Sequence, residues 1–201
     1  MGSHLPLSFF TRTDTLALAR ELLGTILVTE IEGLRTSGKI VETEAYLGRE
    51  DRACHAWNGR RTARTEIMFA PGGYTYVYLC YGIHHLFNIV THQEGEPHAI
   101  LIRAVEPVEG IPTMLERRGK TSLHSSLTAG PGSMSKALGI ETRHSGNLVD
   151  GPPIWVEGPA GLISEDSIIA SPRVGVAYAG EDAFLPYRFR IRNNIWTSPA
   201  K

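Results

Sequence analysis

The strongest constraint on the fold is a pair of strand-like runs joined by a short turn. Residues Tyr74–Tyr81 carry tyrosines at alternate positions, and the run His85–Thr91 begins just after Gly82. Aromatic and β-branched residues at a period of two predict strands, and two such runs around a short turn predict an antiparallel hairpin. An antiparallel sheet is therefore expected in the middle of the chain.

The other predicted elements are short, and strands outnumber helices. Further strands are predicted at Thr25–Ile31, Gly38–Tyr46, Ala99–Val105, Ile154–Glu157, Arg173–Tyr178 and Tyr187–Arg192. Helices are predicted at Leu16–Leu23, Ile111–Arg118 and Ser133–Leu138, with an irregular connection over residues 48–66. The predicted fold class is α+β: a single mixed domain with a curved, mostly antiparallel β-sheet, peripheral short helices and a protruding β-hairpin.

Composition limits the class of protein. The chain has 201 residues, 42% of them hydrophobic, which is enough for one packed domain. No apolar run approaches the roughly 18 residues that a membrane-spanning helix needs, and no secretory signal is recognisable. The two cysteines, Cys54 and Cys80, are expected to be free thiols in a reducing cytosol. We expect residues 1–4 to be a cloning remnant and residues 5–201 to form the domain.

The formal net charge of −1 does not indicate a polyanionic partner, but arginine is unevenly distributed. Five arginines lie between positions 49 and 64: Arg49, Arg52, Arg60, Arg61 and Arg64. They either solvate a loop or contact nucleic-acid phosphates, and both interpretations stay open. The predicted strand Tyr187–Arg192 also alternates apolar and basic residues, which predicts a basic outer face of Arg188, Arg190 and Arg192.

The segment Gly38–Tyr46 holds two carboxylates that could support acid–base chemistry. In a strand, Glu42, Glu44 and Tyr46 share one face with Ile40. The Cα atoms of the two glutamates would then lie roughly 6.6–7 Å apart. A carboxylate beside an aromatic ring can act as a general base. The residues alone also allow an exposed strand face without a chemical role.

Two hairpin residues are candidates for ligand contact. Tyr81 falls at the turn, where an exposed aromatic ring can wedge between base pairs, whereas the alternating tyrosines before it are typical of sheet packing. Asn88 lies on an otherwise apolar strand face, and a buried amide needs hydrogen-bond partners. Asn88 is therefore either a satisfied structural amide or a ligand contact.

No metal site is predicted, and one phosphate site is possible. Five histidines form no closely spaced pair that is backed by nearby ligands: His55, His84, His85, His92 and His98. The segment Gly130-Pro131-Gly132 opens the helix that carries Lys136. A helix N-terminus can bind phosphate, although glycine and proline also start helices for conformational reasons alone.

Together these motifs resemble the alkyladenine (3-methyladenine) DNA glycosylase family. They run in order from Phe9 to Trp196 and so cover nearly the whole chain. The matching motifs are Val41-Glu-Thr-Glu-Ala-Tyr-Leu-Gly48 with Asp51 and His55, Met68-Phe69, Pro71-Gly72, Tyr76-Val-Tyr-x-x-Tyr-Gly82, Asn88, Leu101-Ile-Arg-Ala-x-Glu-Pro107, Gly130-Pro131 and Arg173-Val-Gly-Val176.

The resemblance implies three catalytic residues and a set of DNA contacts. Glu44 matches the general base that deprotonates a water, and Arg103 and the Val174 carbonyl are expected to hold that water. The walls of the base pocket are expected to be Tyr46, His55 and Tyr78, and Asn88 is expected to test the purine substituents. Tyr81 is the expected wedge. The residues expected to contact the DNA backbone are Gly130, Gly132, Lys136, Arg60 and Arg61. Ser133 stands where the family often has lysine, and Lys136 one turn later is the substitute contact that we expect.

The implied activity is that of a monofunctional DNA glycosylase. It would flip alkylated or deaminated purines, such as 3-methyladenine, hypoxanthine or ethenoadenine, out of duplex DNA and hydrolyse the N-glycosidic bond, which leaves an abasic site. No lysine lies beside Glu44 on its strand face, so strand cleavage is not expected. The expected partner is double-stranded DNA that contains damaged purines, without cofactor, metal or membrane.

A monomer is expected, in the nucleoid-containing cytoplasm of a bacterium or the nucleus of a eukaryote. Two alternatives stay open. The first is an O-glycoside hydrolase that uses Glu42 and Glu44 as its acid–base pair. The second is a non-catalytic module that binds distorted DNA.

Overall fold

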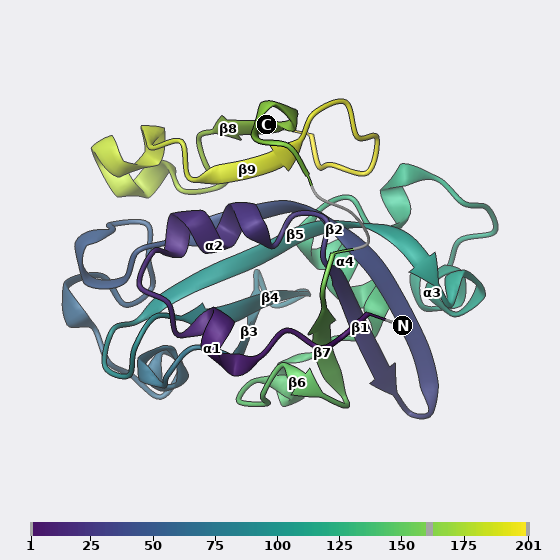
Figure 1. Ribbon diagram of the computed structural model, residues 1–201, viewed down its shortest axis with the longest axis horizontal. Coiled ribbons are helices and arrows are strands. Elements are labelled where there is room, and N and C mark those ends of the chain that lie inside the picture. Colours follow the sequence, from purple (N-terminus) through teal and green to yellow (C-terminus); the bar gives the residue numbers. More distant parts are fainter. Residues whose placement is uncertain (1, 160–162, 200–201) are drawn as a thin grey trace.

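The computed structural model describes residues 2–159 and 163–199, and their fold is one curled antiparallel sheet with short helices around it (Figure 1). Nine strands are found within these residues, and every pair among them is antiparallel. The strands are β1 Ile26–Ile31, β2 Leu34–Tyr46, β3 Thr75–Cys80, β4 His84–Thr91, β5 His98–Glu109, β6 Asp150–Gly151, β7 Ile154–Glu157, β8 Ile168–Ser171 and β9 Arg188–Ile191. The predicted α+β class with a curved antiparallel sheet is confirmed.

The long strand β2 organises the sheet. The strand order is β3-β4-β5-β2-β1-β7-β6, and β9 pairs with the second half of β2 while β8 pairs with β9. Glu44 of β2 therefore lies opposite Leu101 of β5 on one side and opposite Arg188 of β9 on the other. The predicted hairpin is confirmed as β3 and β4, with Tyr81 in the turn.

Short helices cover both ends of the central strands. The α-helices are α1 Leu7–Phe10, α2 Thr15–Glu21, α3 Ile111–Arg118 and α4 Pro131–Leu138. The 3-10 helices are Gly48–Glu50, Trp57–Gly59, Glu66–Phe69, Ser125–Leu127, Thr142–His144, Glu165–Ser167 and Ala177–Phe184. Helix α2 begins one residue before the predicted Leu16, and the Asp14 side chain caps it by accepting a hydrogen bond from the Ala17 N–H at 2.9 Å.

The faces of β2 have different surroundings. On one face, the Thr43 hydroxyl donates to the carbonyl of Ala19 in α2 at 2.8 Å. Because side chains alternate along a strand, Glu42 and Glu44 point to the opposite face. Helix α4 packs against β4 and β5, and its first residues approach the hairpin. Residues 2–4, predicted to be a cloning remnant, lie along β7, where His4 forms a β-bridge with Glu157.

Two sequence predictions in the C-terminal third are wrong. The expected strand Arg173–Tyr178 is a loop that leads into the 3-10 helix Ala177–Phe184, because Arg173 bonds through its side chain and the Val174 N–H bonds to a side chain, not to the backbone of a neighbouring strand. The strand that precedes β9 is instead β8, Ile168–Ser171.

The expected basic outer face of β9 is also wrong for one arginine. Arg192 is exposed and Arg190 is half-buried, but only 1% of Arg188 is exposed. The Arg188 side chain turns inward because its Nε donates to the Glu42 carboxylate at 2.7 Å. The alternation of residues predicted which arginines share a face but not what covers that face.

No helix in the described part of the chain is both long and apolar enough to span a bilayer. The thiols of Cys54 and Cys80 are free, as predicted.

Candidate active site

A cavity of about 360 Å³ lies where the hairpin, β2, β5, α4 and the loop 174–178 meet. It brings together most of the residues that the sequence singled out. Those lining it are Tyr46, His55, Tyr78, Tyr81, Asn88, Arg103, Gly130, Gly132 and Val174. These residues come from segments as distant as β2 and the loop after β8, so the fold assembles the cavity from across the chain.

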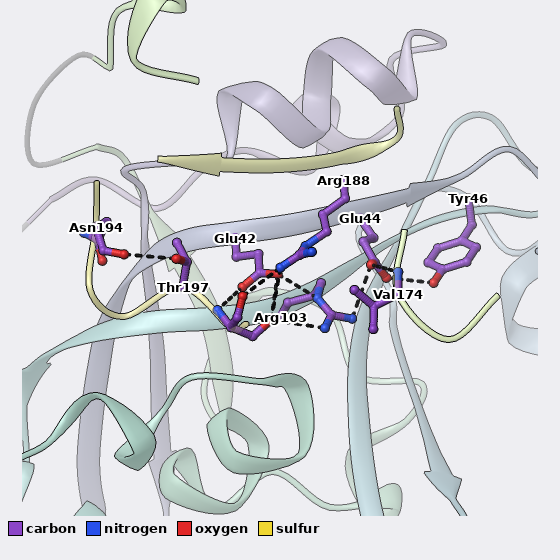
Figure 2. Close-up of polar contacts among 9 residues, drawn as sticks. Glu42, Glu44, Tyr46, Arg103, Val174, Arg188, Asn194 and Thr197 are labelled. Atoms are coloured by element: carbon purple, nitrogen blue, oxygen red, sulfur yellow. Dashed lines mark hydrogen bonds and ion pairs between the residues drawn. The ribbon is translucent and has the colours of Figure 1, made fainter. Parts of the chain in front are cut away.

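Glu44 lies beside Arg103, Val174 and Tyr46, which line the cavity (Figure 2). Its side chain is fully buried, and each of its contacts is to a cavity-lining residue. Oε1 accepts a hydrogen bond from the Val174 N–H at 2.8 Å and lies 3.3 Å from Nη1 of Arg103, and Oε2 accepts one from the Tyr46 hydroxyl at 2.9 Å. The carboxylate is thus held by three cavity-lining residues, although Glu44 is not itself among the residues that line the cavity.

The contact with Val174 refines the prediction. The resemblance implied a role for the Val174 carbonyl, whereas the bond present in the structure uses the Val174 N–H and orients Glu44. A backbone N–H and an arginine thus both contact the same oxygen of Glu44.

Charge and burial fix the protonation of the neighbours of Glu44. Burial alone would lower the pKa of Arg103, but Glu44 and Glu42 raise it above its ordinary value, so Arg103 stays cationic. Burial, followed by the Glu44 charge, raises the pKa of Tyr46 well above its ordinary value. Tyr46 therefore remains a hydrogen-bond donor to Glu44 at neutral pH.

Aromatic rings form one wall of the cavity. The His55 and Tyr78 rings meet edge to face, with centroids 4.7 Å apart, and the Tyr76 and Tyr78 rings are tilted by 31° with centroids 5.4 Å apart. Tyr46 is the predicted opposite wall, and it also lines the cavity. From the sequence, Tyr76 was expected only to contribute to sheet packing. The alternation of the tyrosines nevertheless predicts that Tyr76 shares a face with Tyr78.

The hydrogen bonds of His55 define its tautomer. A guanidinium can only donate, so Nε2 of His55 accepts from Nη2 of Arg64 at 3.3 Å, and Nδ1 carries the proton that is donated to the Tyr76 hydroxyl at 2.8 Å. Burial, together with the charges of Arg64 and Arg60, lowers the pKa of His55 to about 4. His55 is thus a neutral ring at physiological pH.

Arg64 is a site residue that sequence reasoning did not single out from its cluster. Its guanidinium lies 4.7 Å from the centroid of the Tyr78 ring, and its Nε donates to the Tyr76 hydroxyl at 3.3 Å. The spacing of the arginine cluster gave no signal for which member reaches the cavity wall.

Asn88 is buried among apolar neighbours, as predicted. Its amide nitrogen donates to the carbonyls of Tyr76 and Leu86, at 3.0 and 3.3 Å. The nitrogen is therefore a satisfied structural group. The side chain also lines the cavity, and its contact with a ligand stays a prediction.

Tyr81 stands at the tip of the hairpin with 90% of its surface exposed. Its φ angle of 51° lies in the left-handed region, which tyrosine rarely adopts, and the adjacent Gly82 has a φ of 73°. Ile83 beside it is 70% exposed. The turn thus presents two large side chains to solvent, and Tyr81 is the one that lines the cavity.

The residues expected at the DNA backbone fall into two groups. Gly130 and Gly132 line the cavity, and Gly132 has no room for a side chain because a Cβ atom there would lie 2.9 Å from the His84 ring. Lys136, Arg60 and Arg61 are exposed and lie outside it. Arg61 forms a two-bond ion pair with Glu66, at 2.6 and 2.9 Å, so its charge is already compensated.

No group of three or more His, Cys, Asp or Glu side chains suited to a metal ion is found among residues 2–159 and 163–199.

Comparison with known proteins connects this geometry to a family. Residues 8–195 match the family model described as methylpurine-DNA glycosylase (MPG). Relatives provisionally named 3-methyladenine DNA glycosylase include those of Chlamydia abortus (46% identity, over 93% of this chain and 97% of that protein) and Desulfitobacterium hafniense (43%, over 94% and 96%). The relative in Bacillus cytotoxicus is 43% identical, over 94% and 97%. The chain belongs to the methylpurine-DNA glycosylase family and is a DNA glycosylase.

Proposed function

We propose that this glycosylase removes alkylated or deaminated purines, such as 3-methyladenine, hypoxanthine or ethenoadenine, from duplex DNA by hydrolysis of the N-glycosidic bond. Glu44 deprotonates the attacking water, and the product is an abasic site in an uncut strand. The observation that carries the proposal is the position of Glu44, whose carboxylate is held by three cavity-lining groups: the Tyr46 hydroxyl, the Arg103 guanidinium and the Val174 N–H.

The cavity suits a single everted base. Chemistry at the sugar–base bond requires the nucleotide to leave the helical stack, and damaged bases leave it most easily. A volume of about 360 Å³ is within the range of small-molecule pockets, and the His55 and Tyr78 rings offer aromatic surface for a purine. Tyr81 at the hairpin tip fills the gap that the everted base leaves behind.

The base edge meets few polar groups. Asn88 and neutral His55 are the side chains that we assign to the purine edge, and both are fixed by bonds to the Tyr76 residue. A fixed donor or acceptor excludes a purine that presents the wrong partner, because the mismatch leaves a buried polar group unsatisfied. Rejection of normal guanine is the expected consequence at Asn88.

The O-glycoside hydrolase alternative is not favoured. Such an enzyme needs two carboxylates that act on the substrate. All three polar partners of Glu44 line the cavity, whereas Glu42 is bonded to Arg188 and Ser198, which do not. A non-catalytic DNA-binding module is not favoured either, since binding alone gives no reason to orient the buried Glu44 carboxylate with three donors. We further propose that the protein acts as a monomer, on chromosomal DNA in a bacterial cytoplasm.

Glu44→Gln tests the proposal in a base-release assay on lesion-containing duplex. Loss of a general base is expected to lower the single-turnover rate by roughly 10²- to 10⁴-fold, while affinity for the lesion duplex is retained. Glu30→Gln, at an exposed position of β1, is the matched control and should behave as the wild type. Near-normal base release by Glu44→Gln would refute the assignment of the base. Strands should break only after alkali treatment, and breakage without alkali would refute the monofunctional reaction.

A further inference from the structure

Glu42 is a buried carboxylate for which the proposed reaction has no direct use. None of its surface is exposed, and it does not line the cavity. Its Oε1 accepts three hydrogen bonds: from Nε of Arg103 at 2.8 Å, from Nε of Arg188 at 2.7 Å and from the Ser198 hydroxyl at 2.8 Å. Its Oε2 accepts the Ser198 N–H. Figure 2 shows Glu42 between the two arginines, beside Glu44.

Ser198 connects this group to a distant part of the chain. Its hydroxyl also accepts from Nη2 of Arg103 at 3.1 Å, and its carbonyl accepts from Nη2 of Arg188 at 2.8 Å. The segment is anchored just before Ser198, because Asn194 accepts a hydrogen bond from the Thr197 hydroxyl and Trp196 packs against the core. Ser198 is therefore held by its bonds to Glu42 and the two arginines, and also by the anchored residues that precede it.

These contacts determine which nitrogen of Arg103 faces Glu44. Its Nε is bound to Glu42 and its Nη2 to Ser198, so Nη1 is the nitrogen that reaches Glu44, at 3.3 Å. A guanidinium is planar, so fixing two of its nitrogens fixes the third. Glu42 and Ser198 thus determine where the Arg103 charge lies relative to Glu44.

The charges in this group balance in pairs. Two carboxylates, Glu42 and Glu44, lie beside two guanidinium groups, Arg103 and Arg188, and all four side chains are at least nine-tenths buried. Apolar residues in place of a buried ion pair often leave a protein as stable or more stable. Stability alone therefore does not explain why the Glu42–Arg188 pair is buried. Its position next to Glu44 gives a reason.

We propose that Glu42, Arg188 and Ser198 are positioning residues that hold Arg103 against Glu44. Arg188 neutralises Glu42, and the charge of Arg103 is thereby kept for the carboxylate that activates water. The inference rests on the proposed role of Glu44 as the base. It adds that a second layer of side chains, closed by the C-terminal segment at Ser198, determines the pH range in which Glu44 works.

The expected pH effect follows from the groups that face Glu44. These are Arg103 from β5, Tyr46 and Glu42 from β2, and Arg173 from the loop after β8. In Arg188→Met, Arg103 is the one guanidinium among the described residues that still forms ion pairs with Glu42 and Glu44, because Arg173 and Arg190 act on them from farther away. Two carboxylates that share one cation bind a proton more readily, so the acidic limb of the rate profile moves to higher pH.

The test is single-turnover base release across pH 5 to 9, with lesion-duplex affinity measured in parallel. Arg188→Met is expected to lower the plateau rate by roughly 10- to 100-fold and to move the acidic limb up by about one pH unit, with affinity unchanged within about threefold. Glu42→Gln/Arg188→Met removes both charges and should move the acidic limb back toward the wild-type position. Arg188→Lys keeps the charge and should leave the limb in place.

Two further variants separate positioning from folding. Arg192 directly follows the same strand, is exposed and makes no ion pair in the described ranges, so Arg192→Met is the control and should keep the wild-type profile. Ser198→Ala is a mild change that retains the N–H bond to Glu42, and it should lower the plateau rate about threefold to tenfold without loss of affinity. An acidic limb that stays at the wild-type pH in folded Arg188→Met, or one not restored in the double variant, would overturn the inference. Absence of base release by the wild type would instead refute the proposed function.

Discussion

Arg173 and Asp51 form a buried, two-bond ion pair that joins segments 122 residues apart. The same arginine donates to the Ala45 carbonyl at 2.9 Å, and its guanidinium lies 4.8 Å from the centroid of the Tyr46 ring. The Asp51 carboxylate also accepts the N–H groups of Leu47 and Ala53. One ion pair therefore ties the loop after β2 to the loop that carries Val174.

Asp51→Asn is expected to destabilise the protein strongly. Removal of one partner leaves a buried guanidinium without its counter-charge, which typically costs about 3–5 kcal/mol of unfolding free energy. Urea unfolding of the wild type and the variant measures the change. Glu66→Gln breaks the exposed ion pair with Arg61 and serves as the control, with no measurable change expected. Equal stability of wild type and Asp51→Asn would show that this pair does not hold the two loops.

The arrangement of side chains along β2 could be predicted from the sequence. The alternation in Glu42-Thr-Glu-Ala-Tyr46 predicts that the two glutamates and the tyrosine share a face, and the structure confirms it. The hairpin with an exposed Tyr81 followed from the tyrosine pattern and the turn at Gly82. Such local patterns are readable because strand geometry fixes the direction of each side chain.

The partners of these side chains could not be predicted in the same way. Arg188 was expected on an outer face, but it is buried by Glu42, 146 residues away, and by Ser198. The expected strand Arg173–Tyr178 has suitable residues for a strand, yet Arg173 and Val174 bond to Asp51 and Glu44 instead. Contacts between segments far apart in sequence depend on the whole topology, and periodicity carries no information about them.

Stability should decrease in mild acid because two half-buried histidines resist protonation. Burial, followed by Arg64 and Arg60 for His55 and by His92 for His98, lowers the pKa of each histidine to about 4, from 6.5. Between pH 6.5 and 4 the unfolded chain binds protons at these positions and the folded protein does not, so the unfolding free energy falls as pH falls. The upper limit is about 1.4 kcal/mol per pH unit for each histidine.

Urea unfolding at pH 7, 6 and 5 measures this effect. His98→Gln removes one titrating group and should reduce the slope, whereas His124→Gln at an exposed position should not. A slope that is the same in wild type and His98→Gln would contradict the expected contribution.

Tyr81→Ala should separate DNA binding from folding. The side chain is 90% exposed, so its removal should change the unfolding free energy by less than about 0.5 kcal/mol. Loss of the wedge is expected to weaken binding to lesion duplex by roughly tenfold and to spare base release from single-stranded DNA. Ile83→Ala at the same tip is the matched control, with a smaller effect on duplex binding. Equal losses on duplex and single strand would count against a wedge.

The salt dependence of binding should distinguish free arginines from paired ones. Each phosphate contact by a cation releases counterions, so its loss reduces the slope of log K against log salt by about one. Lys136 and Arg60 are exposed and have no carboxylate partner within the described residues, whereas Arg61 is paired with Glu66. Lys136→Ala and Arg60→Ala should therefore each reduce the slope, and Arg61→Ala should change it less. The comparison is made by measuring binding to lesion duplex at salt concentrations from about 50 to 200 mM, a range over which such slopes are resolved. If Arg61→Ala has the largest effect, the Arg61–Glu66 pair must open on DNA.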